Sequence, residues 1–229
     1  GVASGAPSPL AAGATQTLTL SGLNPRTRYS IALKARDEAD NTSPVSNVLA
    51  ADTDSTPLGP RIFHATPDGV GSDCGSLQSC LNAAANGDTV ELAGGFYTTP
   101  ADTLVDDGMG NLVIANMVVR SGVVIRAASG ATVRVDGGGD RIGLAIPAGL
   151  ADVTLRGIRF DNCGVGVRIT GGAHHIEGCT FVTGLHGLVA DGARLDVTGT
   201  RFMEYGGEAI VVRDCSGSFT DCEFWGNNY

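Results

Sequence analysis

Hydrophobic positions recur at a nearly constant interval in the last third of the chain. Three sets of positions repeat about every 21 to 22 residues, an interval typical of a repeat architecture. They are Phe160, Phe181, Phe202 and Phe224; Leu155, Ile176, Val197 and Phe219; and Ile158, Cys179, Thr200 and Cys222. Because a repeat of this length holds two or three short strands and their turns but no long helix, each repeat is predicted to be one flat coil that pairs with the next. The period predicts a parallel β-helix.

A fourth set extends the period toward the N-terminus. Val167, Leu188 and Ile210 keep the same intervals, and Ile146 precedes Val167 by one further period. Since successive side chains of a strand point to opposite faces, the phenylalanines are predicted to stack inside, with neighbouring coils about 4.8 Å apart. The outward positions are then Thr154, Arg156, Arg159 and Asp161.

The chain before these coils predicts a cap. Residues 77–86 have helical spacing and are followed by Gly87, and residues 88–92 then read as a strand. We expect a short helix over about residues 77–85 that covers the end of the solenoid, as terminal repeats of such folds must.

Residues 1–54 have a different pattern. Alternation predicts strands over residues 15–21, 29–37 and 44–51, and the spacing Leu23-x-Pro25-x-Thr27-x-Tyr29 places a tyrosine at a strand start. This run resembles the last three strands of a fibronectin type III domain. Such sandwiches need about seven strands, so residues 1–54 are predicted to be a truncated immunoglobulin-like sandwich, with a spacer role favoured over a binding role. Residues 55–62 are predicted to be a linker.

Residues 63–229 resemble the right-handed parallel β-helix domains of the pectate-lyase-like superfamily. The resemblance rests on the capping helix, on Gly-Asp-Thr-Val from Gly87, and on coils such as residues 153–160 and 175–181. It implies an all-β fold in which a polysaccharide lies along an outer face. The superfamily contains lyases, hydrolases, epimerases and passive solenoids, and its lyases use an arginine or lysine base, often with calcium.

Charge and composition exclude several functions. The net charge is −9, with 15 basic against 24 acidic residues, which argues against nucleic acid as a partner. No apolar run is long enough to span a bilayer. Lys34 is the only lysine, so residues 61–229 leave arginine as the only base for a lyase reaction.

Candidate binding residues fall on one outward row. Arg159, Thr180, Arg201 and Glu223 share this row, so the two guanidinium groups are predicted to lie about 9.6 Å apart, a spacing suited to two carboxylates of an acidic glycan. The alternative is a set of ordinary surface ion pairs, of Arg201 with Glu223 and of Arg156 with Glu177. Trp225 is predicted to face outward, where it either stacks on a sugar ring or is covered by a further coil.

The remaining candidate sites concern cysteines and metals. Cys74 and Cys80 flank the start of the predicted helix at a separation that a disulfide can bridge. Cys179 and Cys222 lie two coils apart and are predicted to be free thiols. The outward carboxylates fall on different columns, so no metal site or cofactor is assigned, although calcium is compatible with the full-length protein.

Together these patterns predict a monomeric, extracellular or cell-surface protein of the kind that bacteria secrete. The expected function is to bind or process an extracellular polysaccharide along the β-helix, in the manner of a polysaccharide lyase or glycosidase. The alternatives are a non-enzymatic stalk or adhesin and a glycan epimerase. We expect this chain, read as a fragment with its targeting sequence upstream and its β-helix truncated at the C-terminus, to have no lyase or hydrolase activity.

Overall fold

The computed structural model describes residues 28–36, 39–52, 60–101 and 103–227. The chain divides into two compact units, Gly1–Gly59 and Pro60–Tyr229. The strand predicted over residues 15–21 and most of the predicted linker lie outside the described residues. Within the described ranges, no helix has the length and apolar character needed to cross a bilayer.

The first unit contains one antiparallel pair of strands among its described residues. β1 (Arg28–Ile31) pairs with β2 (Leu49–Asp52). Beyond Ile31 the pairing is irregular, because the main-chain N–H of Leu33 donates to the hydroxyl of Ser46 at 2.9 Å. The second predicted strand is therefore shorter than expected, and serine hydroxyls replace part of its ladder.

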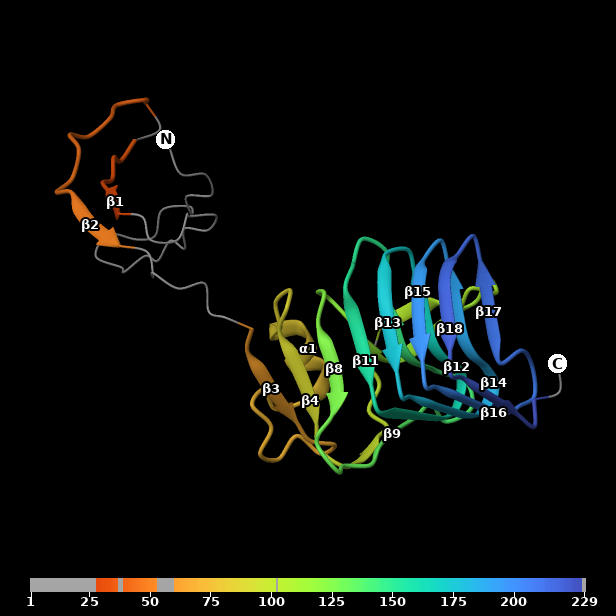
Figure 1. The fold of residues 1–229 in the computed structure, drawn as a ribbon. Helices are drawn as coiled ribbons and strands as arrows, with labels where there is room; N and C mark the ends of the chain where they lie inside the picture. Colours follow the sequence, from red (N-terminus) through yellow and green to blue (C-terminus); the bar gives the residue numbers. More distant parts are fainter. Residues whose placement is uncertain (1–27, 37–38, 53–59, 102, 228–229) are drawn as a thin grey trace. The chain divides into compact units, whose positions relative to one another are not determined.

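The second unit is a parallel β-solenoid with one helix among its described residues (Figure 1). The chain enters through β3 (Ile62–Ala65) and the helix α1 (Leu77–Ala83). The strands that follow are β4 (Thr89–Leu92), β5 (Gly95–Tyr97), β6 (Thr103–Asp106), β7 (Leu112–Val118), β8 (Val124–Ala127), β9 (Val133–Asp136), β10 (Ile142–Ile146), β11 (Val153–Arg156), β12 (Ile158–Thr170), β13 (Ala173–Glu177), β14 (Thr180–Asp191), β15 (Arg194–Thr198), β16 (Arg201–Tyr205), β17 (Ile210–Arg213), β18 (Ser216–Thr220) and β19 (Glu223–Trp225).

Strand pairing gives the solenoid three faces. The first face is a seven-stranded sheet in the order β18-β15-β13-β11-β8-β4-β3. The long strands β12 and β14 each bend, so that their first halves pair with β9 and β16 and their second halves with β10 and β17. We call the sheet formed by these first halves with β5, β9, β16 and β19 the second face. We call the sheet formed by the second halves with β7, β10 and β17 the third face.

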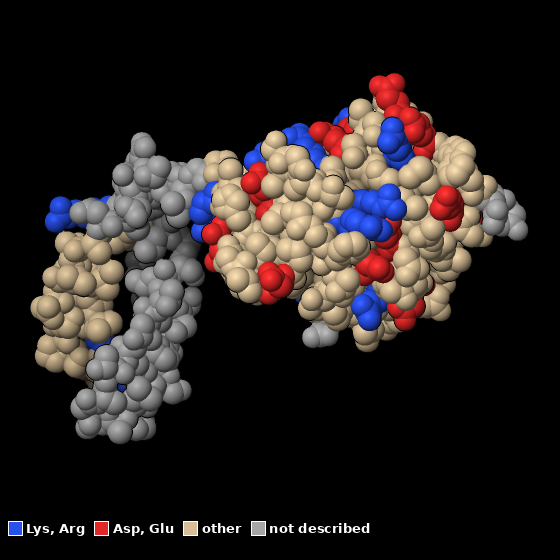
Figure 2. Space-filling model, turned by 90° about the horizontal axis from the view of Figure 1, so that it is seen from below, with Lys and Arg blue, Asp and Glu red and all other residues tan. Residues whose placement is uncertain are grey.

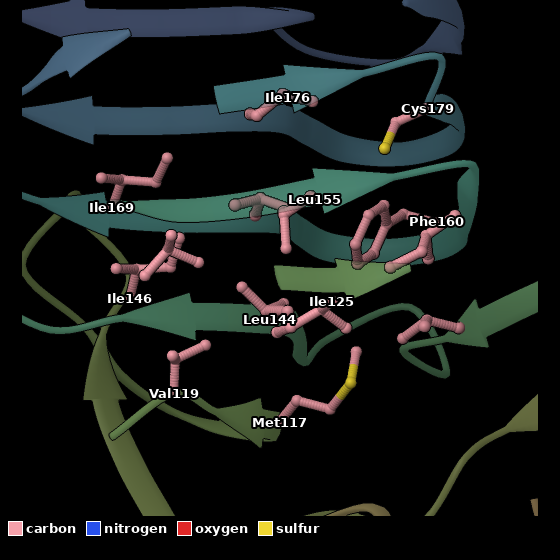
Figure 3. Packing of buried hydrophobic residues seen from close by; sticks show 14 of the residues in the cluster. Met117, Val119, Ile125, Leu144, Ile146, Leu155, Phe160, Ile169, Ile176 and Cys179 are labelled. Carbon is pink, nitrogen blue, oxygen red and sulfur yellow. The ribbon is translucent and has the colours of Figure 1, made fainter. Parts of the chain in front are cut away.

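The interior is filled by rows of identical or similar side chains, as the period predicts. Phe160, Phe181 and Phe202 are fully buried, and the rings of the four phenylalanines stack with centroids 5.1, 4.8 and 5.2 Å apart. Phe224 stacks on Phe202 but is 54% exposed, because no described residue covers its other side. Figure 3 shows the aliphatic rows that pack beside Phe160 in the same core.

One predicted register is wrong. Ile146 lies opposite Ile169, and Leu144 is the residue opposite Val167. The cause is the turn between β9 and β10, where residues 137–141 occupy the place that residues 162–164 take in the next coil. This coil is longer than the regular ones, so the constant period cannot be extended through it.

The corners of the regular coils are turned by residues in the left-handed conformation. Gly157, Gly178 and Gly199 form one row of corners with φ between 57° and 66°. A second row contains non-glycine residues, namely Asn162, Thr183 and Glu204, with φ of 47°, 52° and 60°. Because each corner needs only one such residue, the coils keep their short period.

The capping helix forms where the sequence predicts it but ends two residues earlier. Ser76 caps its N-terminus by accepting a hydrogen bond from the N–H of Ser79. The carboxylate of Asp88 accepts a hydrogen bond from the main-chain N–H of Ala85 at 2.9 Å and another from that of Arg61 at 2.8 Å. These bonds turn the chain away from the helix axis after Ala83. Burial raises the pKa of Asp88, but these bonds and the Arg61 guanidinium outweigh it and lower the pKa overall.

A hairpin that the sequence analysis does not predict covers the third face. β6 pairs antiparallel with β7, and Val105 and Val113 pack on an apolar cluster that lies outside the coil. The cluster contains Ala115, Val118, Ile142, Ala145, Val165 and Val189. The third face is therefore buried on both sides over β10 and the second halves of β12 and β14, whereas β17 is partly exposed.

A column of glycines on the third face provides the space for the phenylalanine rings. The register aligns Gly143, Gly166 and Gly187. A Cβ added at Gly166 would lie 2.5 Å from the carbonyl oxygen of Gly187 and 2.7 Å from Cδ1 of Phe181. Each inward ring thus requires a glycine opposite it.

We expect Gly166→Ala to lower the free energy of unfolding by about 1–3 kcal/mol, because the added methyl group forces a ring and a main chain apart. Gly94→Ala is the matched control, since a Cβ there meets only ordinary contacts of 3.5 Å or more. Urea unfolding followed by circular dichroism measures both. Equal stability of the two variants would contradict the packing described here.

Candidate functional site

An arginine column runs along the outside of the second face. Strand register places Arg134 beside Arg159, then Thr180, Arg201 and Glu223 on successive coils. Arg159, Thr180, Arg201 and Glu223 therefore share the row that the sequence predicts. Strand pairing also places Phe96 next to Arg134, so an exposed aromatic ring begins the column.

The guanidinium of Arg134 lies over this ring, with Cζ 4.6 Å from the centroid of Phe96. Such a cation–π contact attracts the guanidinium to the face of the ring. The side chain of Arg134 is 36% exposed. The start of the column thus combines the positive charge of Arg134 with the aromatic surface of Phe96.

The arginines of the column share buried or surface carboxylates. Nε of Arg134 lies 2.6 Å from Asp161 Oδ2, and Nε of Arg159 lies 2.7 Å from Asp161 Oδ1. Nε of Arg201 lies 2.8 Å from Glu223 Oε2. In all three the closest carboxylate contact uses Nε, and their Nη atoms make no hydrogen bond to the described residues. Arg134 and Arg159 are held by the nearly buried Asp161, whereas the pair of Arg201 with Glu223 is exposed. All three arginines keep their two Nη groups for a ligand.

A second outward column lies beside the first. It consists of Asp136, Asp161, Val182, Met203 and Trp225. Asp161 is only 6% exposed, although the sequence places its side chain toward solvent, because the two arginines cover it. Trp225 is 64% exposed and stands diagonally across from Arg201.

Acidic groups accompany the basic ones elsewhere on the surface. Arg156 contacts Glu177 on the first face, with Nε and Oε2 2.7 Å apart, as the sequence predicts. Figure 2 shows blue and red side chains in contact over one side of the solenoid. The charge pattern is thus one of neighbouring opposite charges, which also suits a purely structural surface.

The cysteines follow the spacing argument. A disulfide joins Cys74 and Cys80, whose Cα atoms are 5.1 Å apart, and ties the loop before α1 to the helix. Cys179 and Cys222 are free thiols, as are Cys163 and Cys215. Burial raises the pKa of Cys163 and of Cys179 to about 12, so both thiols stay protonated and unreactive at neutral pH. Among the described residues, no three His, Cys, Asp or Glu side chains gather as metal ligands would.

Sequence reasoning misses Arg134 and Phe96 because their intervals are irregular. Arg134 precedes Arg159 by more than the constant period, and Phe96 lies further upstream by yet another interval. No constant period links them. The signal that could have found them is the local alternation around each strand, which places Phe96 and Arg134 outward beside the inward Tyr97 and Val135.

The stacked coils, the inward rows and the outer column define a parallel β-helix. The family model described as "Right handed beta helix region" matches residues 108–229, and the chain belongs to this family. The crystal structure of pectate lyase Pel9A is similar at 17% identity, with a TM-score of 0.39. The match covers 75% of this chain and 56% of that chain, so the chain spans little more than half of the length of its structural neighbour. No curated protein matches the chain.

Proposed function

We propose that the second face binds an extracellular acidic polysaccharide along its arginine column. The observation that carries the proposal is the state of Arg134, Arg159 and Arg201, whose Nε atoms contact carboxylates while their Nη groups remain without partners among the described residues. Arg134 and Arg159 are fixed by the nearly buried Asp161, and Arg201 forms an exposed pair with Glu223. Guanidinium Nη pairs bind carboxylates in a bidentate manner, and a fixed arginine loses little side-chain entropy when it does so. Phe96 and Trp225 add apolar surfaces near the two ends of the column.

The setting proposed for this function is the outside of a cell. A disulfide between Cys74 and Cys80 suits an oxidising compartment. We further propose that the first unit is the partial fibronectin type III domain indicated by its sequence and acts as a spacer. The antiparallel pairing of β1 with β2 supports this assignment.

The rival proposal is a structural stalk or adhesin in which the coils supply only length and rigidity. The ion pairs favour it, because Asp161 and Glu223 already compensate the charges of the column. The two proposals differ in one measurable respect, which is whether an acidic polymer binds to this face more tightly than to others.

The test measures binding of polygalacturonate to the chain and to the double variant Arg159→Gln/Arg201→Gln. Each lost charge-assisted contact costs about 1.5 kcal/mol, so the double variant is expected to bind about 100-fold more weakly. Binding should also weaken with added salt. The matched control is Arg156→Gln, which removes a similarly exposed arginine from the first face and should bind as the unsubstituted chain does.

Dextran is titrated as a neutral comparison polymer. The titration with polygalacturonate is also repeated in the presence of calcium. Equal binding by the double variant and the control would reject the arginine column as the site. If the chain binds neither polygalacturonate nor dextran, the result would favour the structural stalk or adhesin. Calcium-dependent release of unsaturated uronate products, abolished in the double variant, would turn the binding proposal into one of lyase activity.

A further inference from the structure

A buried histidine lies at the corner where the chain passes from the third face to the first. His174 is the second residue of β13 and is 1% exposed. The strands β11, β13 and β15 lie side by side (Figure 1), and their register places His174 in one inward row with Val153 and Leu195. Both of these neighbours are buried aliphatic residues. A titratable ring therefore occupies a place that aliphatic side chains fill on the coils before and after it.

Both ring nitrogens of His174 have main-chain partners. Nε2 lies 2.9 Å from the carbonyl oxygen of Gly171, which can only accept, so Nε2 carries a proton and donates it. Nδ1 accepts a hydrogen bond from the main-chain N–H of Val153 at 3.4 Å. One nitrogen donates and the other accepts, so these partners fit the neutral ring alone. A second proton would place an Nδ1–H against the N–H of Val153, with no acceptor for either.

The surroundings of the ring also oppose a positive charge. Burial is the largest influence and lowers the pKa of His174, because it disfavours the charged form. The ring's bond to a main-chain carbonyl and the carboxylate of Asp152 act in the opposite direction, while His175 on the same strand lowers the pKa further. On β15, the guanidinium of Arg194 is directed toward Asp196, with Nη2 and Oδ2 3.5 Å apart. The ring is therefore neutral at neutral pH.

The ring lies against a closely packed segment of the preceding coil. A Cβ added at Gly172 would collide with the carbonyl oxygen of Leu150 and with the ring itself. The main-chain N–H of Asp152 donates to the carbonyl oxygen of Ala173 at 2.8 Å. Residues 150–152 also form one wall of a surface pocket of about 480 Å³. The strand that carries the histidine thus holds this wall in place.

We propose that His174 is an acid-sensitive latch, whose neutral ring holds residues 150–153 against β13 and whose protonation releases them. The added proton breaks the bond to Val153 and leaves a buried cation, a state that is relieved when the ring reaches water. The opened corner therefore binds the proton more readily than the closed one. The contribution of the latch to stability is complete above the ordinary histidine pKa of about 6.5 and is lost as the pH falls below it toward the lowered pKa of the folded state. This device is separate from the arginine column and from the function proposed for it.

The first measurement is hydrogen exchange of the ¹⁵N-labelled chain at pH 7.0 and 5.0, corrected for the intrinsic dependence of exchange on pH. We expect the fraction of molecules open at the Val153 amide to rise severalfold at pH 5.0. The upper limit is about 25-fold, which corresponds to one proton taken up by an exposed histidine of pKa about 6.5. The Arg201 amide is the reference, because it donates to the carbonyl oxygen of Cys179 at another corner, and it should change less.

Two variants assign the response to the ring. His174→Leu supplies the residue that fills this row on the next coil, as Leu195 does, and should abolish the additional opening at pH 5.0. The matched control is His175→Gln, which changes the adjacent histidine. Its side chain is 46% exposed and lies 3.8 Å from Asp196, so the response of the Val153 amide should persist.

A second measurement uses the unsubstituted chain and so does not depend on the folding of a variant. NMR of the ¹⁵N-labelled imidazole should show Nε2 protonated and Nδ1 unprotonated at pH 7.0, with a titration midpoint below 6.5 for His174. Any of three results would overturn the proposal. They are a ring with a proton on Nδ1 at pH 7.0, a Val153 amide that opens at pH 5.0 no more than the Arg201 amide does, and an unchanged acid response in His174→Leu.

Discussion

Replacing Phe181 with alanine is expected to lower the free energy of unfolding by about 3–5 kcal/mol. Its ring is fully buried and stacks on Phe160 and Phe202 with centroids 5.1 and 4.8 Å away. Removal leaves a cavity that these two rings cannot close, because strand register fixes their spacing. Urea unfolding followed by far-ultraviolet circular dichroism measures the loss.

Phe224→Ala is the matched control for this prediction. Phe224 occupies the same row but is 54% exposed and stacks on one ring only. Its removal should cost about 1 kcal/mol, in proportion to the smaller apolar area that it buries. Similar losses in the two variants would show that the stack does not stabilise the interior as we describe.

Arg168→Met is expected to cost about 3 kcal/mol and to loosen the hairpin of β6 and β7. The side chain of Arg168 is 7% exposed; its Nη2 lies 2.7 Å from Asp191, and its Nε donates to the carbonyl oxygen of Asp106 at 3.0 Å. Methionine fills the same space but leaves the Asp191 carboxylate with Arg213 as its remaining partner and removes the bond to Asp106, while Arg213 still binds the carbonyl oxygen of Gly108.

Hydrogen exchange distinguishes this effect from general destabilisation. Amides of residues 103–107 should exchange faster in Arg168→Met at denaturant concentrations where the coils remain folded. Arg156→Met is the control, because the pair of Arg156 with Glu177 is half exposed and worth less than about 1 kcal/mol. Unchanged exchange in the hairpin would contradict the role assigned to Arg168.

The interior of the regular coils could be predicted from the sequence because two-residue alternation and a fixed period determine it together. The row of Phe160, Phe181 and Phe202 is one result, and the pairing of Arg201 with Glu223 is another. Both follow from register alone. Local spacing also predicts the capping helix, but the end of that helix depends on the carboxylate of Asp88, which bonds to Ala85 and is held by the distant Arg61, a contact that local spacing does not contain.

What could not be predicted depends on irregular coils and on contacts across the sequence. Arg134 joins the arginine column through a coil with a longer corner, and Arg168 bonds to the distant hairpin through the carbonyl oxygen of Asp106.

The rows of left-handed corner residues have a consequence for how such a protein can change its size. Gly157, Gly178 and Gly199 turn corresponding corners, and each coil between them carries one member of every interior row. Duplicating or removing one coil therefore adds or deletes one member of each row and leaves the others in contact. The length of the solenoid can therefore change in whole steps of about 4.8 Å, because the new junction has the same packing as the junctions between existing coils.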